Sequence, residues 1–329
     1  MQFIQKFTSS LTTINENNLE DIALQLFQFQ AVNNSVYNSY LTYRGIDYTK
    51  IASLYQIPFL PISFFKSHSI VSGDWKPETE FSSSGTMGAT TSRHPVLSLP
   101  FYLNHAERTF EQFFGSLRDY HFLALLPSYL EREGSSLIAM IEYFIKQSGS
   151  EDSGFYLFNQ EKLIKKIENL RSGKKKVILW GVSFALLDLA EKFEIDLSHC
   201  IIIETGGMKG KRKEWIREDL HGFLCMRFNL NHIGSEYGMT ELMSQAYSFG
   251  HGKYQGPISM KILIRDINDP YQNLPLGRVG AINIIDLANA HSCAFIETQD
   301  LGKLGQNGYF EVLGRLDNSD LRGCNLLVE

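Results

Sequence analysis

The chain has 329 residues, 43% of them hydrophobic and 20% charged, and its formal net charge is −5. This composition is that of a folded protein with a large buried core, so extensive disorder is excluded. The excess of acidic residues argues against a nucleic-acid-binding surface, which requires clustered Lys and Arg. Because the length exceeds that of most single cores, we expect two or three closely packed subdomains.

The sequence also disfavours a membrane protein and a fold held together by zinc or disulfides. No apolar stretch follows a basic N-terminal region, and no run of about 18 apolar residues occurs, so we expect a cytoplasmic chain without a membrane span. The cysteines are widely spaced and form no CxxC pair, which predicts neither a zinc site nor disulfides. A functional cysteine would therefore act through its reactivity. The candidates are Cys200, Cys225, Cys293 and Cys324.

The first part of the chain is predicted to be helical. Apolar residues recur at helical spacing over 18–33, and a second short helical stretch is expected around 50–55. A strand-like stretch at 80–82 leads directly into a segment of Ser, Gly and Thr residues. That segment is the first candidate for chemistry.

The middle of the chain alternates between helical and strand patterns. We expect helices at 100–117, 136–146, 161–170 and 184–193, and strands at 121–126, 155–158, 176–180 and 200–204. Such alternation is typical of a parallel sheet with crossover helices.

After Met239 the pattern changes to strands separated by Gly, Asn and Pro turns, at 260–265, 280–286, 294–297 and 309–313. We therefore expect an α/β fold with layered sheets flanked by helices and a β-rich closing part. The approximate parts are a helical one that includes the Ser/Gly loop (1–95), a parallel α/β one (96–240) and a β-rich one (241–329).

The segment 82–91 places small hydroxyl residues and two glycines just after a strand. Backbone amides in such a loop can curl round an anion, and the hydroxyls add donors, which suits a polyphosphate. The Walker pattern GxxxxGK[ST] is absent. Considered alone, the segment is equally well explained as a plain flexible loop.

A second segment, 234–241, combines an aromatic ring, a hydroxyl and a carboxylate. Tyr237 could stack on a base, Thr240 could contact a phosphate oxygen, and Glu241 could hold Mg²⁺. The alternative is a strand end followed by a helix N-terminus, where Thr and Glu are favourable for structural reasons.

Two further segments contain charged groups of the kinds found at nucleotide sites. Asp300, which we expect at a strand end before Gly302, could accept both hydroxyls of a ribose. Arg315, just past a predicted strand, could form paired hydrogen bonds with phosphate or ribose oxygens. A common turn and a surface ion pair are the respective structural alternatives.

The order and types of these segments resemble the adenylate-forming enzymes, which include acyl-CoA synthetases, luciferases and nonribosomal peptide adenylation domains. That family has an SSGTTG-like loop, a glycine pair, YGxTE, TGD and GR in this order. The glycine pair here is Gly206-Gly207. The resemblance covers nearly the whole chain and implies ATP and Mg²⁺ as cofactors.

The resemblance also implies a role for each matching residue. Thr240 would meet the α-phosphate as a catalytic residue, Glu241 would bind Mg²⁺, Asp300 the ribose hydroxyls, and Arg315 the ribose and phosphate. The groups bordering adenine would be Gly206, Gly207 and Tyr237. The groups wrapping pyrophosphate would be Ser83, Ser84, Gly85, Thr86 and Gly88.

Three departures from the family pattern affect the expected mechanism. The usual lysine after the phosphate loop is not evident, since Thr90 and Thr91 lie near its place, and TGD is replaced by Thr298-Gln299-Asp300. Because the sequence stops at Glu329, shortly after the GR motif, we expect the mobile C-terminal domain and its catalytic lysine to be missing.

The ending 321–327 resembles one branch of the family, the LuxE-type acyl-protein synthetases of fatty-acid reductase complexes. That branch implies a carboxylic acid, and specifically a fatty acid, as substrate. It also implies that Cys324 attacks the acyl-AMP and hands the thioester to a partner reductase. Neighbouring Arg322 would favour the thiolate. The structural alternative is that Cys324 is a small filler at the chain end.

Two other functions remain open. The acyl group could pass directly to CoA, an acyl carrier or an amine without a covalent enzyme intermediate. The chain could also be a nucleotide-binding scaffold subunit without catalysis.

Overall fold

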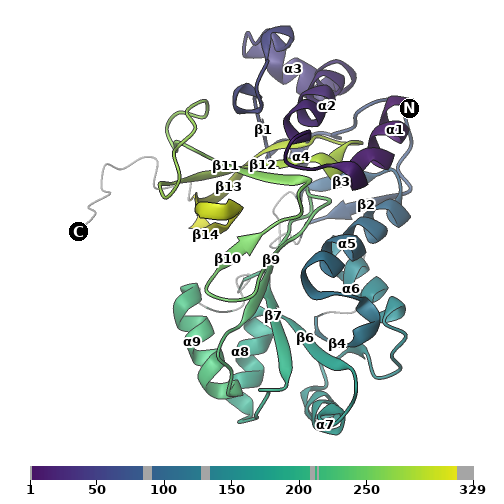
Figure 1. Ribbon diagram of the computed structural model, residues 1–329, viewed down its shortest axis with the longest axis vertical. Coiled ribbons are helices and arrows are strands. Elements are labelled where there is room, and N and C mark those ends of the chain that lie inside the picture. Colours follow the sequence, from purple (N-terminus) through teal and green to yellow (C-terminus); the bar gives the residue numbers. More distant parts are fainter. Residues whose placement is uncertain (1, 84–90, 127–133, 208–211, 213–214, 317–329) are drawn as a thin grey trace, which may run out of the picture.

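The computed structural model describes residues 2–83, 91–126, 134–207, 212 and 215–316. The N-terminal helices are α1 (Gln2–Ser10), α2 (Leu19–Asn33), α3 (Ser35–Tyr43) and the short α4 (Phe64–Ser67), and α1 to α3 gather at one end of the molecule (Figure 1). The prediction for 18–33 is confirmed by α2. Helix α3 was not predicted; the Asn34 side chain caps it by accepting a hydrogen bond from the Tyr37 amide.

The expected helical stretch at 50–55 is wrong. The region instead contains two 3₁₀ turns, η2 (Tyr48–Lys50) and η3 (Leu54–Gln56). Ser53 starts the second turn by forming a capping box with Gln56, and this local bonding interrupts the helix.

The predicted parallel sheet with crossover helices is confirmed. Strands pair in parallel in the spatial order β5-β4-β6-β7-β8. They are β4 (Tyr120–Leu125), β5 (Gly154–Phe155), β6 (Lys176–Val182), β7 (Cys200–Thr205) and β8 (Gly234–Tyr237). The helices of this part are α5 (Leu99–Phe114), α6 (Ser136–Gln147), α7 (Gln160–Leu170), α8 (Ser183–Lys192) and α9 (Arg217–Phe228).

The β-rich part continues the same hydrogen-bonded path. Its strands follow β8 in the spatial order β9-β10-β14-β13-β12-β11, and β1 (Leu60–Pro61) pairs in parallel with β13. They are β9 (Ala246–Ser248), β10 (Lys253–Gln255), β11 (Met260–Arg265), β12 (Val279–Asp286), β13 (Phe295–Leu304) and β14 (Phe310–Arg315). A separate hairpin joins β2 (Thr79–Ser82) to β3 (Arg93–Val96).

Strand β13 corrects the sequence interpretation most strongly. We expected a strand that ends at Glu297, with Asp300 at this strand end, but β13 continues to Leu304, so Asp300 lies within the sheet. The residues beyond Glu297 are held by β12 on one side and β14 on the other. Likewise Arg315 is the last residue of β14 rather than just past it.

The core of the parallel part is rich in aromatic rings. Helices α5 and α6 lie on one side of the strands and α8 and α9 on the other (Figure 1). The ring centroids of Phe110 and Phe144 lie 6.4 and 6.2 Å from that of fully buried Trp180. Burying each such ring stabilises the fold by about 1.5–3 kcal/mol. This packing holds the carboxyl ends of the strands at a fixed edge.

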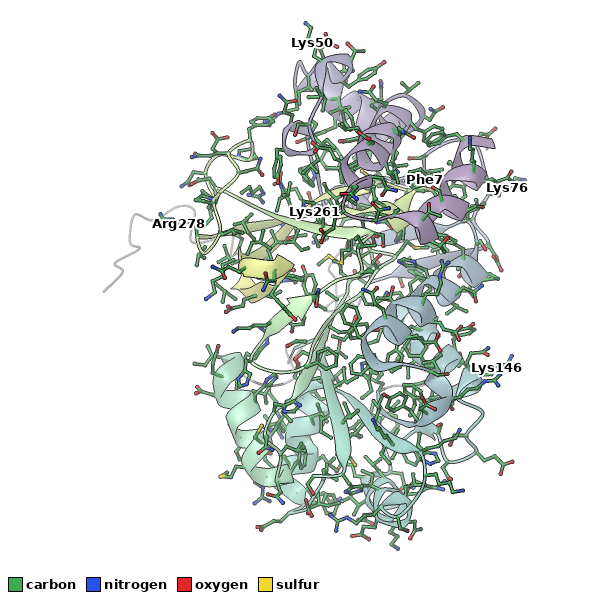
Figure 2. All side chains as sticks on the ribbon, viewed as in Figure 1. Phe7, Lys50, Lys76, Lys146, Lys261 and Arg278 are labelled. Carbon is green, nitrogen blue, oxygen red and sulfur yellow. The ribbon has the colours of Figure 1, made fainter. Side chains whose placement is uncertain are left out.

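Charged side chains lie around this core. Lys50, Lys76 and Lys146 project from widely separated parts of the outline (Figure 2), and each is exposed. Within the described part of the chain, no helix has both the length and the apolarity needed to span a bilayer.

Candidate active site

Three predicted nucleotide-binding residues meet where the parallel strands join the antiparallel ones. The Tyr237 hydroxyl, at the end of β8, donates a hydrogen bond of 2.8 Å to Asp300 Oδ2 in β13. Arg315 lies opposite Asp300 in the β13–β14 ladder, and its Nε is 3.5 Å from Asp300 Oδ1. The structure therefore brings these three residues into one cluster.

Asp300 is buried, and its two carboxylate oxygens face different partners. Burial raises the pKa of its carboxyl, while the Tyr237 hydrogen bond and the Arg315 charge lower it. The Arg315 side chain is 83% exposed and approaches from the solvent side, so this ion pair is weak. Oδ1 accordingly retains capacity for a ligand hydroxyl.

The Tyr237 ring belongs to an aromatic cluster. Its centroid lies 5.9 Å from that of Tyr254 and 5.6 Å from that of Phe310, the latter in an edge-on arrangement. Burial, followed by the negative charge of Asp300, raises the pKa of Tyr237 well above its ordinary value. The hydroxyl therefore stays protonated at neutral pH and acts as a donor.

Thr240 and Glu241 lie in the turn that follows β8. The Thr240 carbonyl accepts a hydrogen bond from His94 Nδ1, and the Glu241 carbonyl accepts one from Asn289 Nδ2, both at 2.8 Å. Neither His94 nor Asn289 was identified from the sequence. They lie far from the turn along the chain, and no spacing signal connects them with it.

The Glu241 carboxyl is buried and lies near positive charge. Burial raises its pKa, and a hydrogen bond from Ser92 together with the charges of Arg315 and Lys66 lowers it. Arg315 is thus a cation shared by Glu241 and Asp300. Lys66, which is on α4, was not predicted to take part in the site.

Only the base of the predicted phosphate loop is described. The Ser83 amide donates to the Ser92 carbonyl at 3.0 Å, and the Ser92 amide donates to Ser83 Oγ at 2.9 Å. These reciprocal bonds close the base of the loop. The predicted loop residues Ser84, Gly85, Thr86 and Gly88 and the predicted nucleophile Cys324 lie outside the described residues.

The glycine pair follows β7 directly. Gly206 and Gly207 have φ angles of 75° and 63°, a region that favours glycine. Thr205, the residue before them, lies opposite Glu236 in the β7–β8 ladder, so the pair begins next to the strand that ends in Tyr237. Without side chains, the two glycines allow a flat ligand to approach the backbone closely.

Two buried carboxylates that sequence analysis missed lie at the same edge of the sheet. The Ser183 hydroxyl donates to Glu204, and the Thr205 hydroxyl donates to Glu236. Burial alone would raise the pKa of Glu204, but the nearby His221 and the hydrogen bond from Ser183 hold it below its ordinary value. Because Glu204 lies between the serine and the histidine, this is not the arrangement that activates a serine nucleophile.

The donor set fits a nucleotide with its metal. Mg²⁺ is commonly held by one or two carboxylates together with substrate phosphates, and Glu241 is a buried carboxylate beside the closed base of the loop. Within the described ranges, no group of three or more His, Cys, Asp or Glu residues could hold a metal on its own.

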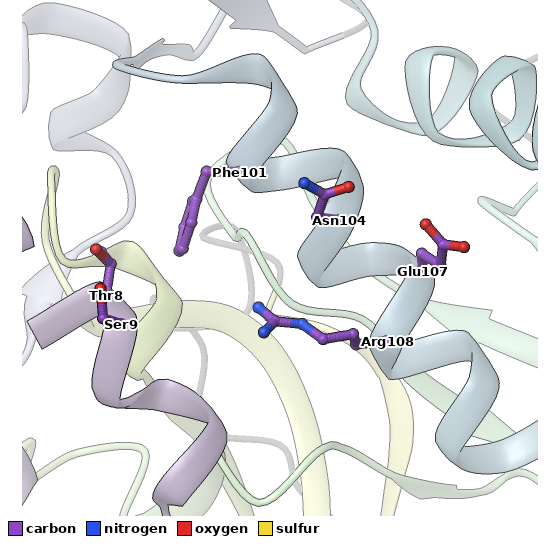
Figure 3. Close-up of a pocket in the computed structure, with 6 residues that line it drawn as sticks. All are labelled: Thr8, Ser9, Phe101, Asn104, Glu107 and Arg108. Carbon is purple, nitrogen blue, oxygen red and sulfur yellow. The ribbon is translucent and has the colours of Figure 1, made fainter.

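A hollow lies away from this cluster, between α1 and α5. Its volume is about 440 Å³, and Figure 3 shows the Arg108 side chain extending from α5 toward Ser9 on α1. Thr8, Phe101, Asn104 and Glu107 complete the lining. It contains none of the residues that the motifs single out.

The fold is that of the N-terminal domain of the adenylate-forming enzymes. A solved structure that is similar over most of the chain is a 2-hydroxyisobutyryl-CoA ligase bound to 2-HIB-AMP and CoA. It has a TM-score of 0.66 at 11% identity and covers 93% of this chain and 77% of that one.

Two further solved structures are similar over shorter spans. ATP-bound MatB from Rhodopseudomonas palustris has a TM-score of 0.52 at 17% identity and covers 72% of this chain and 47% of its own. The AMP complex of MenE, the O-succinylbenzoate coenzyme A synthetase of Bacillus subtilis, has a TM-score of 0.53 at 18% identity and covers 74% and 50%. The match thus spans about half the length of each of these two chains.

Sequence comparisons add no assignment. No protein-family model matches the chain, and no curated protein matches it.

Proposed function

We propose that this chain activates a carboxylic acid with ATP, forming acyl-AMP and pyrophosphate. The observation that carries the proposal is the contact of Tyr237 and Arg315 with Asp300, with Glu241 sharing the Arg315 charge. A ribose-binding acid beside a metal-binding acid and a guanidinium suits a nucleoside triphosphate. Solved structures with this fold, which hold ATP, AMP or an acyl-AMP, support the same ligand.

Each residue of the cluster has a part in binding. Asp300 accepts hydrogen bonds from the ribose hydroxyls, while Tyr237 and the glycine pair border the base. Thr240 donates to the α-phosphate. The base of the loop at Ser83 presents the loop residues to the leaving pyrophosphate.

In the chemical step a substrate carboxylate oxygen attacks the α-phosphorus, and the bond from that phosphorus to the pyrophosphate oxygen breaks. Mg²⁺ held by Glu241 would neutralise phosphate charge. Arg315 stabilises the charge that develops, and orientation of the two reactants supplies much of the rate enhancement.

The acyl acceptor in this proposal is Cys324. Its thiolate attacks the acyl carbonyl, the bond from that carbon to the phosphate oxygen breaks, and AMP leaves. The resulting thioester passes to a partner such as a reductase, and the activated acid is a fatty acid. These finer assignments rest on the resemblance to acyl-protein synthetases.

The first test is carboxylate-dependent exchange of labelled pyrophosphate into ATP, measured across short-chain, long-chain and aromatic acids. Exchange with one class of acid supports adenylation and identifies the substrate class. If no acid supports exchange although ATP binds, the nucleotide-binding scaffold is the better interpretation.

The second test is intact-protein mass analysis after incubation with ATP and the active acid. We expect an acyl adduct on the wild type that is lost in Cys324→Ser. The matched control is Cys225→Ser on α9, a half-buried thiol whose pKa burial raises, and this variant should keep the adduct. Full exchange without any adduct would instead favour direct transfer to CoA, a carrier or an amine.

A further inference from the structure

In the turn that carries Thr240 and Glu241, two consecutive backbone carbonyls accept hydrogen bonds from buried side chains. His94 on β3 binds the first and Asn289, at the end of η6 (Leu287–Asn289), binds the second. Both side chains are 1% exposed. Two catalytic candidates thus depend for their placement on buried side chains from distant parts of the chain.

The contact with Thr240 fixes the protonation of His94. A carbonyl oxygen can only accept, so His94 Nδ1 must carry the proton. Burial lowers the pKa of His94 to about 4, with nearby His291 acting in the same direction and the Thr240 hydrogen bond acting against it. His94 is therefore neutral at physiological pH and is the Nδ1–H tautomer.

The surroundings of His94 restrain its ring. The Phe65 ring meets it edge-on, with the centroids 5.6 Å apart. A small cavity of about 10 Å³ is lined by His94, Asn289, His291 and Ser292 among others, a volume that suits about one water molecule. Two of the residues that line it, Asn289 and Ser292, each have a buried side-chain oxygen without a hydrogen-bond partner among the described residues.

His94 also belongs to the hairpin that carries the predicted phosphate loop. It pairs with Phe81 in the β2–β3 ladder, and Ser83 and Ser92 close the loop base two positions further along the hairpin. The hydrogen bond of 2.8 Å between His94 Nδ1 and the Thr240 carbonyl therefore connects the hairpin with the turn of Thr240.

We propose that His94 is a positioning residue, whose Nδ1–H holds Thr240 and Glu241 in place relative to the base of the loop at Ser83 and Ser92. The catalytic part of this inference rests on the proposed adenylation. Because a displacement of about 1 Å can cost about 100-fold in rate, a lost hydrogen bond at this turn should lower the rate of the chemical step.

The activity test compares two substitutions of similar size. In His94→Asn an amide nitrogen takes the place of Nδ1, whereas His94→Leu has no donor. We expect His94→Leu to lower kcat of pyrophosphate exchange roughly 10- to 100-fold with little change in KM for the acid. His94→Asn should restore kcat to within a few-fold of wild type.

The matched control is His121→Leu. His121 is also a buried histidine bonded through Nδ1, in this case to Ser150 Oγ at 2.6 Å, but it lies near the opposite end of β4 from the site. The His121→Leu substitution should lower Tm without lowering kcat per folded molecule. Equal loss of kcat in His94→Asn and His94→Leu, or a loss that simply follows Tm, would overturn the proposal.

A second measurement does not depend on activity. Two-bond ¹H–¹⁵N spectra of histidine-labelled protein report ring tautomers, and the His94 signals are those missing in His94→Asn. We expect the Nδ1–H pattern; an Nε2–H pattern would overturn the contact with Thr240. A wild type that shows Nδ1–H but no exchange would refute adenylation while supporting the contact.

Discussion

Tyr237 donates its hydroxyl proton to Asp300 across a distance of 2.8 Å, which joins the last residue of β8 to the interior of β13. The bond crosses from the parallel part of the sheet to the antiparallel part. It uses one carboxylate oxygen and leaves the other near the exposed guanidinium of Arg315. Asp300 is thus oriented by one partner while remaining able to bind a ligand.

Replacing Asp300 with Asn should weaken ATP binding. The amide presents one acceptor instead of two, so a ribose hydroxyl loses a charge-assisted bond, at a cost of about 1.5–3 kcal/mol or roughly 10- to 150-fold in Kd. Titration calorimetry with ATP measures the change. Asp74→Asn, at an exposed position, is the control. Equal affinities in the two variants would exclude Asp300 from the nucleotide site.

Tyr237→Phe should destabilise the fold. The substitution removes the donor and leaves a buried carboxylate oxygen with one partner fewer, which costs about 1–3 kcal/mol of the free energy of unfolding. Urea unfolding of the variant measures the loss. Tyr43→Phe removes the same atom from a residue that is 90% exposed and should change little. If both variants unfold alike, the Tyr237 bond contributes nothing to stability.

Two buried histidines and a third that is partly buried should make the protein sensitive to mild acid. Burial lowers the pKa values of His94, His105 and His291 to about 4. Unfolded histidines bind protons near pH 6.5, so between about pH 6.5 and 4 the unfolded state holds more protons and stability falls as pH falls. Each contributes about 3 kcal/mol over that window.

Urea unfolding at a series of pH values tests this dependence. Burial raises the pKa values of Asp286 and Asp300, and these groups act in the opposite direction. The informative quantity is therefore the difference between the wild type and His105→Gln, whose slope should be smaller by one proton. Identical slopes would mean that His105 is not held neutral in the folded protein.

Gly302→Ala should separate β13 from β14. A Cβ atom at this position would overlap the Glu311 carbonyl oxygen, and backbone must move to admit it. We expect a loss of about 1–3 kcal/mol in stability, together with weaker ATP binding because Arg315 is carried by β14. Denaturation and calorimetry measure the two effects.

The matched control is Gly222→Ala within α9, where a Cβ would meet nothing within 4 Å. Replacing a helical glycine with alanine stabilises by about 0.5–1 kcal/mol. The two Gly→Ala changes should therefore have opposite signs. If Gly302→Ala changed neither stability nor ATP affinity, the backbone between β13 and β14 would be able to move apart at little cost.

The success of the sequence predictions differed between the two halves of the sheet. Strands β4, β6 and β7 were predictable because each is mainly a continuous apolar run, whereas the short β5 and the polar β8 carry no such pattern. The second half of β13 was not predictable, because Gln299, Asp300 and Gly302 are typical of turns, and only pairing with β12 and β14 keeps them extended.

Some residues of the candidate site could be predicted from the sequence, and others could not. Tyr237, Asp300 and Arg315 could be named from motif order, and they do meet. His94 and Asn289 could not, since their contacts with the turn depend on the tertiary fold alone. The buried pairs of Ser183 with Glu204 and of Thr205 with Glu236 escaped for the same reason.

The parallel pairing of β1 with β13 has a consequence for synthesis of the protein. Leu60 lies opposite Ile296, so an early segment finds its partner only after the long intervening stretch and β13 itself have left the ribosome. Contacts of such long sequence separation slow folding and leave the early segment exposed in the meantime. Nascent chains that end before β13 should therefore depend on chaperones, and competence to bind nucleotide should arise abruptly once β13 and β14 have been made.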